Sequence, residues 1–482
     1  MSRFRSNFEE QTTPRLQWLS DSQLEELHSA TIEILERVGT RVDHPEALEM
    51  LRDAGCLVKD KVVRIPGWLV EECIQQAPKR VTLANRRRER CLYLEKNRSY
   101  FGPGSDLPYT IDMDTGERRS VVKEDIEQAV KLADFLPNLD FVMSYGIPTD
   151  VPVEENELHQ FEAMLTNSIK PIVFTALSHE NTAKIVEMAA VAVGGLDKLK
   201  ERPLMALYTE PLSPLVHTYD GVAKMFTCID NGVPVIYTPG VVAGGTTPVT
   251  KAGTIVQMNA ESLAGLVMAQ VKQRGASVII GGGATPMDMM TSATLYGAPD
   301  TQMNFCAMTE LSRFYEVPNF TEAGCCNAPV PDAQAGMEAS MGILLSQLSG
   351  ANLIHDVGYL DGGKTGTLPF LVMCDEFIDA ARHIGSGTRI NENTLAVEQI
   401  EKIGPAGQFI STVHTAKNFR NEIWLSKISN RDMWDNWEKQ GKKDLHEKAK
   451  EKTREILLSH EPEPLSATAR EEISRIVTSG RT

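Results

Sequence analysis

The sequence lacks several features that would place it in common functional classes. No run of about 18 apolar residues is present, so no membrane-spanning helix is expected. Positive charge is scarce, with 49 Lys and Arg against 65 Asp and Glu and a net charge of −16. Nucleic-acid-binding proteins usually carry a basic surface, so that function is disfavoured. The first residues, MSRFRSNFEEQTTP, have no apolar signal core, and a cytoplasmic location is expected.

The eight cysteines show no CxxC motif and no zinc-finger spacing. Reduced and mostly buried thiols are therefore expected. The candidate ligands His217, Cys325, Cys326 and His355 have no metal-ligand spacing, and we predict no metal site. Cys325 and Cys326 are adjacent, so at most one of them could face a pocket, and small buried side chains are the favoured interpretation.

Three helices are predicted near the N-terminus. Residues 20–39 have an apolar stripe, a capping box between Ser20 and Gln23, and Gly39 as a stop. Shorter helices are predicted over 44–55 and 68–78. We expect residues 1–90 to form a helical cap.

A regular alternation of strands and helices follows. Eight short apolar runs precede helical segments, and they begin near residues 99, 141, 171, 203, 234, 277, 318 and 352. This alternation predicts a (β/α)8 TIM barrel over 91–385. A doubly wound sheet remains the alternative, although no GxGxxG follows the first strand.

The last part, residues 386–482, is predicted to be a helical extension packed on the barrel. Three of the five tryptophans lie within 419–441, which suggests a homo-oligomer contact.

In a TIM barrel the site lies at the carboxyl ends of the strands. Those segments are rich in aromatic residues and glycine, and we interpret them as poor in acid–base groups. An aromatic pocket of this kind suits a quaternary ammonium ion through cation–π attraction. We therefore predict no catalytic residue and a substrate-binding set of Tyr100, Phe101, Tyr208, Asn327, His355, Tyr359, Phe370, Gly281, Gly282 and Gly283.

Two other interpretations of these segments stay open. The glycine run 281–283 could approach a phosphate, although close approach of another large ligand is favoured. A Schiff-base lysine would indicate an aldolase or lyase, but Lys170 precedes a strand and Lys364 lies in a glycine-rich loop.

Several stretches together carry a family resemblance over nearly the whole chain. They include IEILERVGTRVDHPEALEMLRDAG, YFGPGSDLPYTIDMDTGERR, GGTTPVTKAGTIVQMNAESLAG and PVPDAQAGMEAS. The chain resembles the corrinoid-dependent trimethylamine methyltransferase family. The resemblance implies a barrel that moves a methyl group to the Co(I) of a corrinoid (cobalamin) carried by a separate protein, with no cofactor bound by this chain.

Founding members of that family carry pyrrolysine in the loop where this chain has Cys325, Cys326, Asn327 and Ala328. The chain thus resembles the branch without pyrrolysine, whose substrates are quaternary amines such as glycine betaine and proline betaine. A quaternary ammonium already carries a neutral amine as its leaving group, so position and desolvation matter more than acid–base catalysis. A non-catalytic quaternary-amine-binding protein and a barrel lyase or aldolase remain the alternatives.

Overall fold

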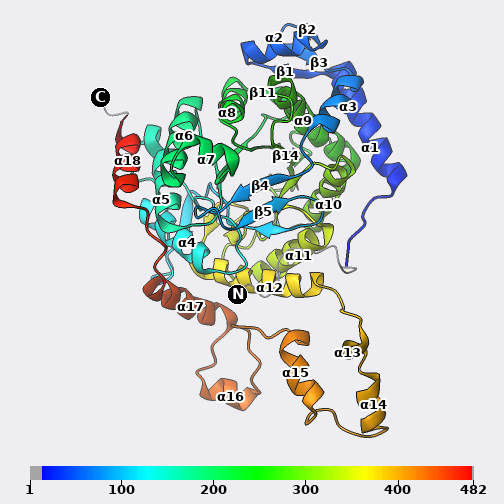
Figure 1. The fold of residues 1–482 in the computed structure, drawn as a ribbon, viewed down its shortest axis with the longest axis vertical. Coiled ribbons are helices and arrows are strands. Elements are labelled where there is room, and N and C mark those ends of the chain that lie inside the picture. The colour runs from blue at the N-terminus through cyan, green and yellow to red at the C-terminus, as the bar shows by residue number, and fades with distance from the viewer. Residues whose placement is uncertain (1–13, 480–482) are drawn as a thin grey trace.

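The computed structural model describes residues 14–479. The segment MSRFRSNFEEQTTP, for which no signal core is predicted, lies almost entirely outside these residues. Its centre is a seven-stranded parallel sheet that curves into a half-barrel, with helices around the outside (Figure 1). Its strands, in spatial order, are β6 (Tyr100–Phe101), β17 (Leu353–His355), β16 (Asn319–Glu322), β14 (Val278–Gly281), β12 (Val235–Tyr237), β10 (Met205–Thr209) and β9 (Ile172–Phe174).

Seven of the eight predicted strands are confirmed, and the run predicted from 141 is not a regular strand. That segment nevertheless lies between the two edge strands, because Leu139 bridges Phe101 of β6 and Val142 bridges Ile172 of β9. The Val142 amide donates to the Pro171 carbonyl at 2.9 Å. The pairing is confined to isolated bridges, so the prediction of a full strand was wrong there.

The outer helices cover the sheet in chain order. They are α4 (Lys123–Phe135), α5 (Asn156–Asn167), α6 (His179–Val193), α7 (Leu196–Glu201), α8 (Tyr219–Asp230), α9 (Lys251–Lys272), α10 (Pro299–Phe314), α11 (Ala333–Ser349) and α12 (Leu368–Gly385). Inside the sheet, apolar side chains fill the interior, among them Phe141, Ile236, Phe320 and Leu353. None of the helices within residues 14–479 is both long and apolar enough to cross a membrane.

The N-terminal helices are confirmed, but the cap is not purely helical. α1 (Asp21–Glu33) has the predicted Ser20–Gln23 capping box, and its π-helical continuation η1 (Ile34–Val38) ends at Gly39 with a φ of 78°. α2 (Pro45–Asp53) and α3 (Gly67–Gln76) follow. β1 (Thr40–Val42) pairs with β11 (Val216–His217) and with β3 (Val62–Arg64), and β3 pairs in turn with β2 (Leu57–Lys59). β4 (Val81–Ala84) and β5 (Cys91–Leu94) form a hairpin. These short strands have two to four residues, too few for a clear alternating pattern.

Small sheets lie over the carboxyl ends of the main strands. One contains β7 (Tyr109–Ile111), β8 (Arg118–Ser120), β18 (Tyr359–Leu360) and β19 (Thr365–Gly366). The other pairs β13 (Gly240–Ala243) with β15 (Gly283–Pro286), and the 3-10 turn η2 (Val153–Glu155) lies before α5. These elements extend the loops that carry the site.

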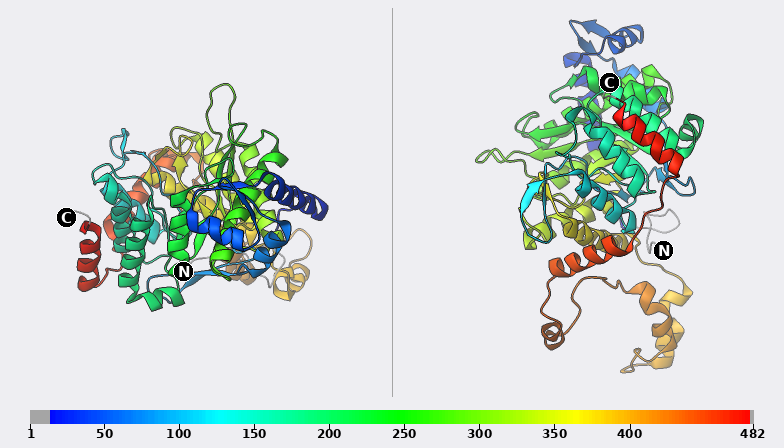
Figure 2. Two further views of the ribbon diagram at one scale, coloured as in Figure 1. Left: turned by 90° about the horizontal axis from the view of Figure 1, so that it is seen from above. Right: turned by 90° about the vertical axis from the view of Figure 1, so that its left-hand side faces the viewer.

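The C-terminal extension has two unlike parts (Figures 1 and 2). α17 (Leu445–Ser459) packs against α12, and α18 (Ala467–Thr478) packs against α6 and α5. The preceding segment projects away from the body and holds α13 (Glu392–Leu395), α14 (Val397–Ile403), α15 (Val413–Glu422) and α16 (Trp434–Lys439). The prediction that this extension packs on the barrel therefore describes the two last helices only.

Candidate functional site

A cavity of about 650 Å³ opens at the carboxyl ends of the parallel strands, where a barrel enzyme would hold its site. The loops that follow four of the strands supply its charged wall. Asp106 follows β6, Glu210 follows β10, and Glu322 ends β16. His355 ends β17, and Asp356 comes directly after it.

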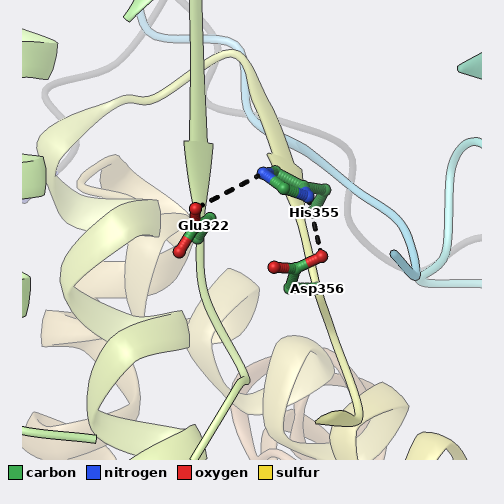
Figure 3. A group of neighbouring side chains, drawn as sticks. All are labelled: Glu322, His355 and Asp356. Atoms are coloured by element: carbon green, nitrogen blue, oxygen red, sulfur yellow. Dashed lines mark ion pairs between the residues drawn. The ribbon is translucent and has the colours of Figure 1, made fainter. Parts of the chain in front are cut away.

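Glu322, His355 and Asp356 form the centre of this wall (Figure 3). His355 Nδ1 lies 2.8 Å from Asp356 Oδ1, and His355 Nε2 lies 4.0 Å from Glu322 Oε1. Asp356 has a φ of 63°, in the left-handed region that residues other than glycine seldom adopt. Such strain often accompanies a functional site, and here it turns a carboxylate toward the imidazole.

The enclosed carboxylates repel one another, which changes their protonation. Burial, with a further contribution from Asp356, raises the pKa of Glu322 to about 8. The Asp106 side chain is exposed to the cavity, yet desolvation by the surrounding protein and the nearby Asp356 raise its pKa to about 7. Burial alone would lower the pKa of His355, but Asp356 and Glu322 more than offset this and raise it.

Further lining residues add an aromatic ring from Tyr208, a carboxylate from Glu157 and an amine from Lys224. The hydroxyl of Tyr208 donates to Glu210, and burial raises the pKa of that carboxyl. The ring of Tyr208 lies 5.5 Å from the His355 ring. Lys224 donates from Nζ to the Ala176 carbonyl at 2.5 Å, and burial lowers its pKa although Asp220 and Glu157 oppose this.

Two glycines make room for the central carboxylates. A Cβ at Gly283 would lie 2.3 Å from Glu322 Oε1, and one at Gly104 would lie 2.2 Å from Asp356 Oδ1. Any other residue at either position would displace the carboxylate beside it. These glycines therefore fix where the negative charge of the cavity can lie.

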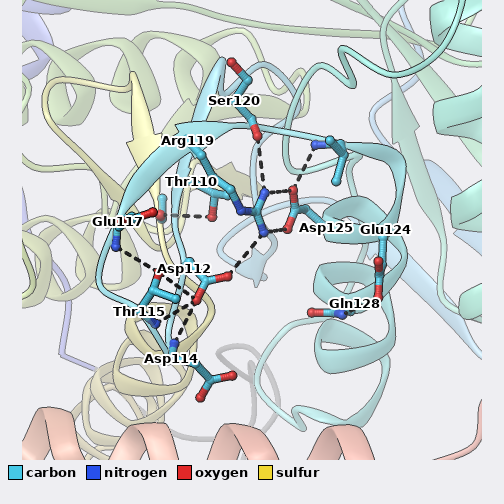
Figure 4. A network of polar contacts seen from close by, with 12 residues as sticks. Thr110, Asp112, Asp114, Thr115, Glu117, Arg119, Ser120, Glu124, Asp125 and Gln128 are labelled. Carbon is cyan, nitrogen blue, oxygen red and sulfur yellow. Dashed lines mark hydrogen bonds and ion pairs between the residues drawn. The ribbon is translucent and has the colours of Figure 1, made fainter.

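The β7–β8 hairpin, which follows the loop that carries Asp106, is held to α4 by a polar network (Figure 4). Arg119 donates two hydrogen bonds to Asp125 of α4 at 2.7 and 2.8 Å. The Asp112 carboxylate accepts from the Asp114 and Thr115 amides and so closes the turn of the hairpin. Bidentate pairing of this kind gives a defined orientation.

The predicted substrate-binding residues divide into two groups. Tyr208, His355 and Gly283 line the cavity. Tyr100, Phe101, Tyr359 and Phe370 do not, so the expected box of these four aromatic residues is not formed there. Phe101 and Phe370 are fully buried in the core, and the Tyr100 hydroxyl accepts from the Tyr93 amide. The Tyr359 hydroxyl donates to the Tyr145 carbonyl at 2.7 Å.

Asn327, Gly281 and Gly282 also lie off the cavity wall. The Asn327 side chain is used internally, since it accepts from the Gly297 amide and donates to the Thr294 carbonyl. Gly281 and Gly282 have φ values of 145° and 150°, and a Cβ at Gly281 would lie 2.1 Å from the Phe320 carbonyl oxygen. Backbone conformation and packing explain these two glycines without a ligand.

The absence of acid–base groups predicted for the strand ends is wrong. Asp106, Glu210, Glu322 and Asp356 all follow or end an apolar strand, and that position was the signal available in the sequence. The prediction of no metal considered only His217, Cys325, Cys326 and His355. Glu322, His355 and Asp356 offer ligand atoms within 4.8 Å of one another and could hold an ion, so the absence of a metal stays a prediction.

The prediction for the cysteines is confirmed. All eight are free, and seven are buried, including Cys325 and Cys326. Burial raises the pKa of Cys326 to about 12, which keeps that thiol protonated. Neither thiol lines the cavity.

A parallel half-barrel with a cavity at the carboxyl ends of its strands is the architecture of a barrel enzyme. The chain belongs to the trimethylamine methyltransferase (MTTB) family, whose model matches residues 3–481. It is a methyltransferase, as the resemblance implied.

The relatives support this assignment over most of the chain. A trimethylamine methyltransferase MttB of Desulfitobacterium hafniense is 33% identical, covering 92% of this chain and 90% of the relative. A glycine betaine methyltransferase of the same species is 31% identical, covering 94% and 95%. The structure of the Methanosarcina barkeri monomethylamine methyltransferase shares the fold, with a TM-score of 0.53, 12% identity, and coverage of 90% of this chain and 87% of that one.

Proposed function

We propose that this methyltransferase takes a methyl group from a quaternary amine and passes it to the Co(I) of a corrinoid carried by a separate protein. The observation that carries the proposal is the ring of carboxylates around the cavity. Asp106, Glu210, Glu322 and Asp356 together attract a cation, and an enclosed cavity strengthens that attraction relative to bulk water.

The protonation of the cavity carboxylates fits a cationic substrate. Because burial, and then the neighbouring Asp356, raise the pKa of Glu322 to about 8, this carboxyl holds a proton for much of the time near pH 7. A bound cation stabilises the ionised carboxylate and so favours the loss of that proton. Tyr208 adds the face of an aromatic ring to the same wall.

The reaction needs position more than proton transfer. The corrinoid supplies the nucleophile, the C–N bond breaks, and its electron pair stays on the nitrogen of a neutral tertiary amine. The task of this chain is then to hold the C–N bond in line and exclude water. The chain itself binds no cofactor in this proposal.

The substrate we propose is a betaine, such as glycine betaine or proline betaine. Support comes from the glycine betaine methyltransferase among the relatives and from Lys224. Lys224 is the one Lys or Arg among the described residues that line the cavity, so it is our candidate for the substrate carboxylate. His355 is a second donor, held by Asp356.

The mouth of the cavity suits a protein partner. Ile147, Val153 and Leu177 line the cavity and are among the exposed large apolar side chains. Met290 on the loop after β15 is 94% exposed. An apolar rim around a charged cavity is a favourable docking surface for the corrinoid protein. We place the chain in the cytoplasm, where free thiols are stable.

The finer architecture is part of the same proposal. We propose a (β/α)8 barrel over 91–385 in which residues 139–142 take the place of the second strand, supported by their bridges to β6 and β9. Residues 1–90 and 386–482 would be its N-terminal cap and C-terminal extension.

A substrate panel tests the proposal. The protein is mixed with cob(I)alamin and with glycine betaine, proline betaine, carnitine, choline or trimethylamine, and loss of Co(I) absorbance is followed. We expect a betaine to react fastest. Choline keeps the cation and lacks the carboxylate, so equal rates with choline would remove the betaine part of the proposal. Fastest reaction with trimethylamine would assign a tertiary amine.

A further inference from the structure

Tyr296 adds a second aromatic ring to the cavity wall, besides that of Tyr208. It belongs to the segment 294–297, which lies between β15 and α10. The ring also packs on the turn between β18 and β19. A Cβ at Gly363 would lie 3.7 Å from Tyr296 Cζ, and one at Gly362 would lie 3.8 Å from its Cδ2. The turn therefore supports one side of a ring that is at the same time part of the cavity wall.

The Tyr296 side chain is close to the carboxylates of the cavity. Burial, and then Glu322, raise the pKa of its hydroxyl, and Asp356 acts in the same direction. Burial also raises the pKa of Tyr208, with further contributions from Glu210, Glu322 and Asp356. Both rings thus have Glu322 and Asp356 as charged neighbours, and both phenols stay protonated.

A quaternary ammonium ion needs apolar as well as anionic surroundings. Carboxylates attract its charge, but its methyl groups offer no N–H group that a carboxylate could accept. The face of an aromatic ring attracts the charge and contacts the methyl groups closely. A protonated tertiary amine keeps one N–H group for a carboxylate, so its binding depends less on a ring. A ring beside Glu322 therefore favours a quaternary amine over a protonated tertiary amine.

Asn327 holds the segment that carries Tyr296. Its side-chain oxygen accepts from the Gly297 amide at 2.9 Å, and its side-chain nitrogen donates to the Thr294 carbonyl at 2.8 Å. These two hydrogen bonds lie on either side of Tyr296 in the chain, so one carboxamide fixes the backbone before and after the ring. Thr294 is also held by its bridge to Met287.

Glu338 of α11 fixes Asn327 in turn. Glu338 is buried, and its Oε2 accepts from the Asn327 amide at 2.7 Å. A Cβ at Gly297 would overlap the same carboxylate oxygen, so a glycine is required where the segment passes Glu338. The position of the Tyr296 segment is therefore set by contacts that exist before any ligand binds.

We propose that Tyr296 determines the specificity of the cavity for a quaternary ammonium ion and that Asn327 is the positioning residue that keeps Tyr296 in place. The inference rests on the proposed function, because it needs a quaternary amine as the ligand. It also gives Asn327 a role that agrees with its location off the cavity wall.

Titration calorimetry of the full chain with tetramethylammonium and trimethylammonium at pH 8 tests the role of Tyr296. Tyr296→Leu should lower the affinity for tetramethylammonium about tenfold and that for trimethylammonium no more than about threefold, because the ring is lost and the carboxylates remain. Tyr296→Phe keeps the ring and should bind both ions as wild type does. Tyr93→Leu, on the exposed side of β5, is the matched control and should change neither affinity.

Two kinds of result would contradict this role, and they have different meanings. Wild-type binding of both ions with no loss in Tyr296→Leu, or with an equal loss for both ions, would overturn the inference and leave the proposed function standing. A wild-type protein that binds neither ion would contradict the proposed function itself, and the inference with it.

A double-mutant cycle tests the role of Asn327. Asn327→Ala should show the same selective loss for tetramethylammonium, and adding Tyr296→Leu should lower the affinity no further, because Asn327 acts through Tyr296. Asn231→Ala is the control, since the Asn231 side chain likewise donates to a backbone carbonyl, that of Thr227 in α8. Losses that add in the double variant, or a loss in Asn327→Ala that is equal for the two ions, would overturn the positioning role.

Discussion

The interior of the half-barrel and the cavity above it are built by the same strands but have opposite chemistry. Along β16, Phe320 points into the apolar interior, and Glu322, two residues on, points to the same side and reaches the cavity. β17 repeats the pattern with Leu353 and His355. Each of these strands therefore contributes one residue to the stability of the interior and, two residues further on, one residue to the cavity.

The largest expected effect is on stability, from the interior layer. Phe320 is 1% exposed and its ring lies 4.2 Å from that of His355. Phe320→Ala should lower the free energy of unfolding by about 3–5 kcal/mol, because it removes a buried ring and leaves a cavity. Urea denaturation at pH 7 measures this. A loss below about 1 kcal/mol would show that the interior is not tightly packed at this layer.

The next effect is on activity, from the cavity layer. Glu322→Gln should lower kcat/KM for the quaternary amine about 100-fold, because a charge that faces the cation is lost while the shape is kept. Its stability should be unchanged or slightly raised near pH 8, where wild-type Glu322 must ionise in an enclosed site. Glu471→Gln, on the exposed face of α18, is the control and should alter neither quantity. Equal activity of Glu322→Gln and wild type would remove Glu322 from the site.

The pH dependence sharpens the contrast. Glu322 and Asp106 have raised pKa values of about 8 and 7, so the folded protein holds protons that the unfolded chain releases. The contribution of these two carboxyls to the stability of the free protein is therefore fully present below the ordinary carboxyl pKa and is lost as pH rises toward 8. Affinity for a cation changes in the opposite direction, because ionised carboxylates bind it better.

Titration calorimetry with tetramethylammonium as the probe measures that affinity. Between pH 6 and 8.5 we expect an increase of about tenfold, with protons released on binding. Glu322→Gln should flatten the profile. A wild-type affinity that is constant over this range would show that the cavity carboxylates do not contact the cation.

The smallest effect concerns the choice among cations. Lys224→Met should lower kcat/KM for glycine betaine about tenfold and leave that for choline nearly unchanged, because only the betaine has a carboxylate to contact the amine. Wild type and Lys224→Met should also be compared by thermal unfolding, since Lys224 also donates to the Ala176 carbonyl. An equal loss for both substrates would assign Lys224 a structural role.

The sequence predicts the strands well and the site less well, for a physical reason. Strand existence follows from local apolar runs, and the capping box at Ser20 is a local pattern too. Tyr100, Phe101, Tyr359 and Phe370 are buried and do not line the cavity, because a ring at a strand end can turn into the core as easily as into a cavity. Tertiary packing, which a sequence does not display, decides between the two.

The sequence places two of the cavity carboxylates in a recognisable pattern. Tyr208 and Glu210 in YTE, and Phe320 and Glu322 in FTE, continue the strand period of two past the last apolar residue. The proximity of Glu322 to His355 cannot be predicted from the sequence, because it depends on the register of β16 with β17, in which these two residues pair. The strand predicted from residue 141 is not formed, because the chain there makes only isolated bridges.

A labelled-methyl balance tests the central claim most directly. Glycine betaine with 13C in its methyl groups is incubated with the protein and excess cob(I)alamin, and the products are quantified by NMR. The account predicts one dimethylglycine for each Co(I) consumed, and a rate about 100-fold lower with Glu322→Gln. Binding of the betaine without dimethylglycine, or equal product with and without the protein, would contradict it.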